Sequence, residues 1–154
     1  DNLLLEGYTG KRDPRKKTVG VPFVLMIHKF FPMANAFFTS LGFNVVLTDP
    51  TSEETIRLSQ QLAQSETCYP VKLIYGHIQQ LIDQKVDYIF LPSIHTMKHE
   101  KSRVKHNYGC VYMQCPSQRH WTSKARASPC SARYLIWTSG RKPWPPPCWG
   151  WAKY

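Results

Sequence analysis

Residues 19–47 read VGVPFVLMIHKFFPMANAFFTSLGFNVVL, and this stretch decides the fold class of the chain. Its first part, Val19 to Ile27, is an apolar run typical of a buried parallel strand, although Pro22 stands near its beginning. The compact apolar segment from Phe30 to Leu41 predicts a helix. Phe43 to Leu47 then predicts a second strand. The stretch therefore predicts a strand, a helix and a strand in close succession.

The residues that follow continue the alternation. Thr51-Ser52-Glu53-Glu54 supplies a capping hydroxyl and first-turn acids for a helix that we expect to end near Ser65. A further helix should begin at Cys68 to Pro70, where the missing N–H of proline costs little. Val86 to Leu91 predicts a third strand, which Pro92 should end. Short connections imply parallel strands with right-handed crossovers, so we expect an α/β fold with a short parallel sheet.

In a parallel sheet, binding sites form beyond the carboxyl ends of the strands. The residues that follow the three predicted strands are His28 and Lys29, Thr48 and Asp49, and Ser93 and His95. Cys68 approaches the same edge if its helix begins there. We therefore expect the candidate site at this edge.

Cys68 is the main candidate residue of that edge. Backbone N–H groups and the positive end of a helix favour a thiolate, the form that binds metal or attacks a substrate. An isolated cysteine is also commonly a small buried apolar residue, and this alternative stays open. His95 and His99 stand at i, i+4 spacing, but no acid or cysteine completes a metal set there. The basic segment Lys98 to Lys105 is either a solvated loop or a grip for a CoA phosphate or an acidic partner.

Composition divides the chain near Cys115. The chain has 154 residues, enough for one domain, and a net charge of +10. Residues 116–154 hold seven Lys or Arg, no Asp or Glu, and all five Trp. We expect residues 1–18 to be a basic, turn-rich linker, residues 19–115 the domain, and residues 116–154 an irregular, disordered tail. No apolar stretch suits a signal peptide or a membrane span, so a cytoplasmic protein, or a piece of a longer one, is expected.

The tail has two alternative explanations. Reading its codons one base back would turn Trp-Thr pairs into pairs that contain Asp, which restores acids and strand-like apolar runs. We therefore interpret the tail as a frameshift product. The alternative is a genuine basic, Trp-rich tail that binds nucleic acid or an anionic membrane. Tails of that kind usually show repeats or an amphipathic period, so neither partner is expected.

Seven motifs, taken in chain order, resemble those of one known family. They are Gly10-Lys11-Arg12, Val19-Gly20-Val21-Pro22, His28-Lys29-Phe30-Phe31-Pro32, Leu41-Gly42-Phe43, Glu66-Thr67-Cys68-Tyr69-Pro70-Val71-Lys72, Gly76-His77 and Leu91-Pro92-Ser93-Ile94. Residues 3–114 resemble the domain of unknown function that follows the ATPase modules in 2-hydroxyacyl-CoA dehydratase activase-related proteins. A more distant similarity extends to the dehydratase subunits, which hold an iron-sulfur cluster.

The resemblance implies a Rossmann-like, three-layer domain with cysteines that hold a 4Fe-4S cluster. Matched by motif, Cys68 and Cys110 would be cluster ligands, and Lys72 would tune the local charge. Ser93 stands where relatives carry a further cysteine. A cubane cluster usually takes one thiolate per iron, so the remaining ligands have to come from other sequence, or no cluster is bound.

Two functions follow from these observations. The first is a 4Fe-4S or electron-transfer module that works with a separate ATPase domain and an acyl-CoA dehydratase. The second is a non-catalytic docking or scaffold domain for the same partners. The chain has no Walker sequence, and Gly20-Val21-Pro22 is not a dinucleotide fingerprint. We identify no complete active site.

Overall fold

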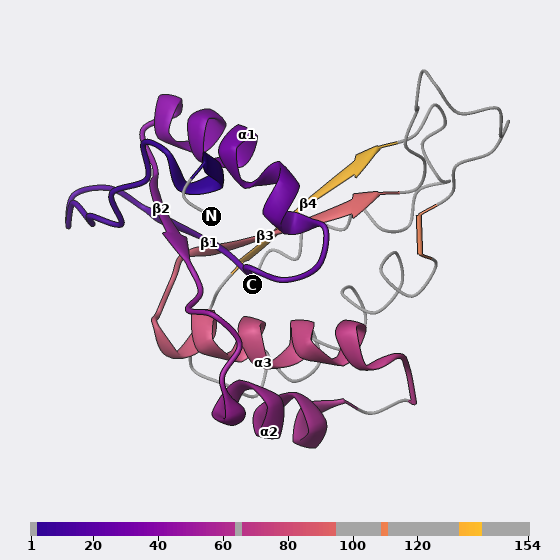
Figure 1. The fold of residues 1–154 in the computed structure, drawn as a ribbon. Coiled ribbons are helices and arrows are strands. Elements are labelled where there is room, and N and C mark those ends of the chain that lie inside the picture. The colour runs from indigo at the N-terminus through magenta and orange to yellow at the C-terminus, as the bar shows by residue number, and fades with distance from the viewer. Residues whose placement is uncertain (1–2, 64–65, 95–108, 111–132, 140–154) are drawn as a thin grey trace, which may run out of the picture.

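The computed structural model describes residues 3–63, 66–94, 109–110 and 133–139 (Figure 1). Four parallel strands form one sheet in the order β2-β1-β3-β4. The strands are β1 (Thr18–Val21), β2 (Asn44–Leu47), β3 (Tyr88–Ile94) and β4 (Arg133–Ser139). The α/β fold with a short parallel sheet is confirmed.

Helices cover both faces of the sheet. They are the short 3-10 helix η1 (Leu3–Leu5) and the α-helices α1 (Ile27–Ser40), α2 (Glu53–Leu62) and α3 (Tyr69–Asp83). Figure 1 shows α1 on one face of the sheet and both α2 and α3 on the other. The strand order explains this arrangement, because the crossover from β1 to β2 and the crossover from β2 back past β1 to β3 run in opposite directions across the sheet, and right-handed crossovers then place their helices on opposite faces. The three-layer, Rossmann-like prediction is therefore confirmed.

Each face of the sheet has its own apolar core. On the α1 face, Phe31 and Val19 are fully buried, and the ring of Phe38 meets the ring of Phe90 edge-on at 5.2 Å. On the α3 face, Ile78 and Leu81 are fully buried among strand residues. Together these clusters fix the sheet between α1 and α3 by burial of apolar area.

Helix α2 packs mainly against α3, on its outer side (Figure 1). The buried residues of α2 are polar, namely Thr55 and Ser59. They face Gly76 of α3, where an added Cβ would collide with the carbonyl oxygen of Thr55 and with Oγ of Ser59. Glycine therefore allows the two helices to approach closely.

The first strand is shorter than predicted. Strand β1 ends at Val21, and α1 already begins at Ile27. Pro22 has no backbone N–H for a sheet ladder, and the N–H of Val24 donates to the carbonyl of Pro22 to start a turn. Leu25 in this turn has φ of 56°. The apolar run to Ile27 thus supplies buried turn residues as well as a strand.

The predicted end of the third strand at Pro92 is wrong. Strand β3 continues through Pro92 to Ile94. Among the described residues, β1 pairs with β3 only at Tyr88 and Ile89, so at Pro92 the described pairing of β3 is with β4 on one side, and a proline is tolerated in a strand that is paired on one side. Strand β4 lies within the tail that we expected to be irregular and disordered. Its residues pair in parallel with β3 from Tyr88↔Arg133 to Ile94↔Ser139.

The N-terminal segment, which was expected to be a linker, contacts strand β2 of the sheet. The Tyr8 hydroxyl accepts a 2.9 Å hydrogen bond from the N–H of Leu47, and its ring packs against Phe31. The side chain of Asn44 donates to the carbonyls of Asp13 and Lys16 at 2.8 and 3.1 Å. These contacts hold the segment against both ends of β2, at Asn44 and at Leu47.

Candidate functional site

An open pocket of about 340 Å³ lies beyond the carboxyl ends of β1 and β2. Three chain segments line it: the β1–α1 turn with the first turn of α1, the β2–α2 connection and the first turns of α3. The lining residues are Phe23, Val24, Leu25, His28, Pro50, Thr51, Pro70 and Leu73. The sheet order reverses at β1, and such a reversal is where ligands bind in open α/β sheets. The pocket therefore occupies the predicted edge.

His28 belongs to the first turn of α1 rather than to the end of a strand. Its ring centroid lies 3.9 Å from that of Phe23, and both side chains line the pocket. Partial burial lowers the pKa of His28 below its usual value. Lys29, the other residue expected at this position, is exposed.

His77 is the residue of the site that the sequence analysis did not select. It is fully buried in α3, with Nδ1 2.8 Å from Oγ1 of Thr48 and Nε2 3.0 Å from Oγ1 of Thr51. Burial, and secondarily the charge of the nearby His28, lowers the pKa of His77. His77 stands three residues after Ile74 and four before Leu81, a spacing that puts it on the apolar face of its helix, and this was the available signal.

Cys68 occupies the predicted position at the start of α3. It is the N-cap residue, its backbone is extended, and its thiol is exposed and free. Its own carbonyl accepts from the N–H groups of Val71 and Lys72, and Pro70 has no N–H. The helix start therefore offers fewer donors to an anion than the sequence suggests.

Lys72 is engaged with an acidic neighbour. Its ammonium lies 2.6 Å from a carboxylate oxygen of Glu66, in an ion pair whose acidic member is almost fully exposed. A hydrogen bond from Lys72, followed by its charge, lowers the pKa of Glu66. The charge of Lys72 is thus matched within the motif itself.

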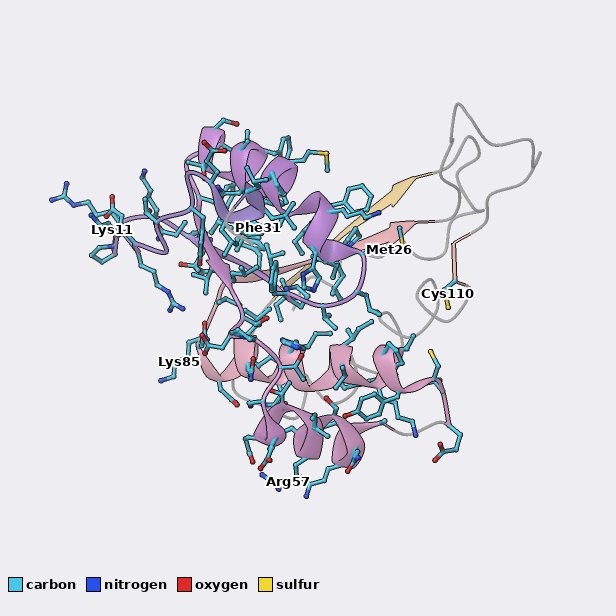
Figure 2. The ribbon with its side chains drawn as sticks, viewed as in Figure 1. Lys11, Met26, Phe31, Arg57, Lys85 and Cys110 are labelled. Atoms are coloured by element: carbon cyan, nitrogen blue, oxygen red, sulfur yellow. The ribbon has the colours of Figure 1, made fainter. Side chains whose placement is uncertain are left out.

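Cys110 belongs to a short described piece, residues 109–110, and is exposed and free. In Figure 2 it lies on the side of the molecule toward which the arrows of β3 and β4 point. Among the described residues, no group of three or more His, Cys, Asp or Glu side chains could hold a metal ion. The described cysteines therefore do not form a complete cluster site.

Other candidates from the sequence have no described side chain. Ser93 is described through its backbone alone, as part of β3. His95, His99 and the basic segment from Lys98 to Lys105 lie outside the described residues. No described helix is long and apolar enough to cross a membrane.

Comparisons with known proteins assign the family. A family profile described as the CoA enzyme activase uncharacterised domain matches residues 18–122, about two thirds of the chain. Searches of curated proteins and of solved structures gave no match. The match begins at β1 and ends before β4, so it covers β1 to β3 and α1 to α3. The chain therefore belongs to the family of CoA enzyme activase uncharacterised domains, as its motifs indicated.

Proposed function

We propose that this domain is a non-catalytic docking module of an activase-related protein, and that it binds the ATPase modules through the outer face of α1. The observation that carries the proposal is a stripe of exposed apolar side chains along α1 and its C-cap residue, Leu41. Met33, Phe37 and Leu41 recur at four-residue spacing and are 51%, 56% and 57% exposed. Such a stripe on a helix whose other face is already buried is typical of a contact surface.

The chemistry of this face suits an apolar partner. From Ile27 to Leu41 the only charged residue is Lys29, at the far end of the helix from Leu41. Two more exposed leucines, Leu3 and Leu4, belong to η1, which contacts α1. Charge-free apolar surface with an aromatic residue is where binding energy concentrates in protein interfaces.

The position of η1 favours the ATPase modules as the partner. In activase-related proteins that our chain resembles, these modules come before the present domain. A module joined ahead of Leu3 would emerge beside the outer face of α1, because η1 packs against that helix (Figure 1). A short covalent connection also raises the effective concentration of the partner.

Binding between the full 154-residue protein and separately purified ATPase modules of an activase-related protein from the same source tests the proposal. Phe37→Glu should weaken binding roughly 30-fold or more, because it places a charge in an apolar contact. Thr39→Glu, an exposed position on another side of α1, is the matched control and should change affinity little. Absence of wild-type binding, equal affinity of Phe37→Glu, or binding only to an acyl-CoA dehydratase would overturn the assignment.

A second candidate function is the 4Fe-4S or electron-transfer module. The exposed, free thiol of Cys68 at the N-cap of α3 supports it, and Cys110 is a second exposed thiol. The described residues do not by themselves fit a cubane cluster, because they supply two thiols and no third ligand group. In this proposal other cysteines, from this chain or from a partner, complete the ligand set.

Anaerobic expression of the full chain with iron tests the second candidate. A visible thiolate-to-iron absorption that Cys68→Ser and Cys110→Ser each abolish would support it. Thr67→Ser, next to the first ligand, is the control that should keep the colour. A folded wild-type protein that is colourless and free of iron would exclude it.

A further inference from the structure

The hydrogen bonds around His77 have a defined direction. Oγ1 of Thr48 accepts a 2.8 Å hydrogen bond from the N–H of Phe23, and lies 2.8 Å from Nδ1 of His77. Thr48 is 3% exposed, and among the described residues its own proton has no acceptor except Nδ1. A proton on Nδ1 would leave the buried Thr48 hydroxyl without an acceptor, which is strongly disfavoured. Thr48 therefore donates to His77.

The tautomer of His77 follows from this direction. With Nδ1 as the acceptor, neutral His77 carries its proton on Nε2 and donates it to Oγ1 of Thr51, 3.0 Å away. Its lowered pKa keeps the ring neutral near pH 7. The Thr51 hydroxyl accepts from His77 and still has its own proton to donate. Among the described contacts that proton has no acceptor.

Thr51 lines the open pocket, so this proton is available to a molecule bound there. The rest of the wall is mainly apolar and includes Phe23, Val24 and Leu73. Among the lining residues that the structure describes there is no Asp, Glu, Lys or Arg, and His28 is the one titratable residue of that set. An ionised ligand would find no opposite charge on these walls, whereas an apolar body with one oxygen acceptor would satisfy them.

We propose that the pocket between the β1–α1 turn, the β2–α2 connection and α3 binds a small uncharged carbonyl compound. Its carbonyl oxygen accepts a hydrogen bond from Oγ1 of Thr51, and its apolar body lies against Phe23 and Leu73. His77 is a positioning residue in this arrangement. It donates its Nε2 proton to Oγ1 of Thr51, so that the Thr51 hydroxyl directs its own proton to the ligand.

Two probes of matched shape test the proposal with the full-length protein. Cyclohexanone offers a carbonyl oxygen, and methylenecyclohexane replaces that oxygen with a CH₂ group. Ligand-observed NMR titration should show that Thr51→Val weakens cyclohexanone binding about 3- to 10-fold, the loss of one hydrogen bond. The same substitution should change methylenecyclohexane binding by less than about twofold. This probe accepts no hydrogen bond from residue 51, and its apolar contacts with the pocket remain. Thr51→Ser keeps the hydroxyl and should restore cyclohexanone binding.

The histidine tautomer gives an independent readout. Long-range ¹H–¹⁵N spectra of the free protein should show His77 with its proton on Nε2. Thr51 is exposed, so Thr51→Val should remain folded, and the dispersion of amide resonances checks this. Equal losses for both probes, no saturable binding of either probe to the folded chain, or a proton on Nδ1 of His77 would overturn the proposal.

Discussion

The backbone N–H of Gly76 donates a 3.0 Å hydrogen bond to Oγ of Ser59, and this bond joins α3 directly to α2. Oγ of Ser59 in turn donates to the carbonyl of Thr55 at 2.7 Å. Both partners are buried. The contact is polar and tight, so α2 is held by a few specific atoms rather than by a broad apolar face.

Gly76→Ala should therefore destabilise the protein although alanine favours helices. The added methyl group would collide with Thr55 and Ser59 and push α2 away from α3. Overpacking of this kind costs about 1–3 kcal/mol, which exceeds the gain of roughly 1 kcal/mol in helix propensity at the upper end of that range. Urea denaturation measures the difference. Gln60→Ala, on the exposed side of α2, is the control, and an equally stable Gly76→Ala protein would contradict the account.

The stability of the protein should fall in mildly acidic solution because of His77. Its pKa in the folded state is lowered, so the unfolded state binds the proton more readily. The contribution is complete above the usual histidine pKa of about 6.5 and is lost as the pH falls toward the lowered value. The slope approaches about 1.4 kcal/mol per pH unit for one proton.

Urea denaturation at several pH values between about 8 and 5.5 measures this slope, a range above the usual carboxylate pKa values. His77→Gln should lower the stability at pH 8 and flatten the slope. His28→Gln should leave most of the slope, because burial is the main cause of the lowered pKa of His77 and the charge of His28 is the smaller one. A slope that survives in His77→Gln would assign the pH dependence to other groups.

Asn44 should be a main anchor of the N-terminal segment. Its side chain makes three hydrogen bonds with backbone groups of Asp13 and Lys16, and it is 7% exposed. Asn44→Ala should cost about 2–3 kcal/mol because it leaves these groups unpaired. Amide exchange should rise at residues 13–17. Asn35→Ala removes only a 3.5 Å contact with Thr39 and should have little effect, so similar losses for the two variants would contradict the role of Asn44.

The pairing of β4 with β3 makes a prediction about the tail. Within the part of the chain that the structure describes, β3 beyond Ile89 is paired in register with β4 alone. Truncation after residue 132 should therefore accelerate hydrogen exchange in β3 from Phe90 onward, while Val45 and Val46 of β2 stay protected. Exchange in β3 that is unchanged by the truncation would show that β4 does not pair in solution.

The frameshift interpretation of the tail makes a prediction about the gene sequence. Sequencing the coding DNA from codon 115 onward should find a shifted reading with acids and strand-like apolar runs. The family match ends at residue 122, close to the change in composition. An uninterrupted frame whose shifted reading is unrelated to the family would discard the interpretation and leave β4 as a native strand.

The sequence predicted the starts of α2 and α3 well because capping residues and an early proline mark a helix start within a few residues. Ser52 caps α2 with a reciprocal hydrogen bond to Thr55, and Cys68 caps α3 two residues before Pro70. Strand limits depend on neighbours. The apolar run to Ile27 does not reveal that pairing stops at Val21, and Pro92 does not reveal that the described β1–β3 pairing ends before it, at Ile89.

The sequence predicted where the candidate site lies, but it did not predict the hydrogen bonds that join its side chains. The edge of the sheet and Cys68 followed from the order of strands and helices, whereas the triad of Thr48, Thr51 and His77 depends on contacts between residues 26 or 29 positions apart. The short apolar run from Tyr134 to Trp137 was available as a strand signal for β4. The basic, Trp-rich composition around it outweighed that signal.

The pairing of the central strand also limits how the chain can be made. The N–H of Thr18 donates to the carboxylate of Asp87 at 2.8 Å, and the N–H of Asp87 donates back to the carbonyl of Thr18 at 3.1 Å. During synthesis on the ribosome, the edge of β1 that pairs with β3 stays unpaired until nearly seventy further residues have been made. An expression fragment that stops before β3 would keep that edge open to other chains and aggregate.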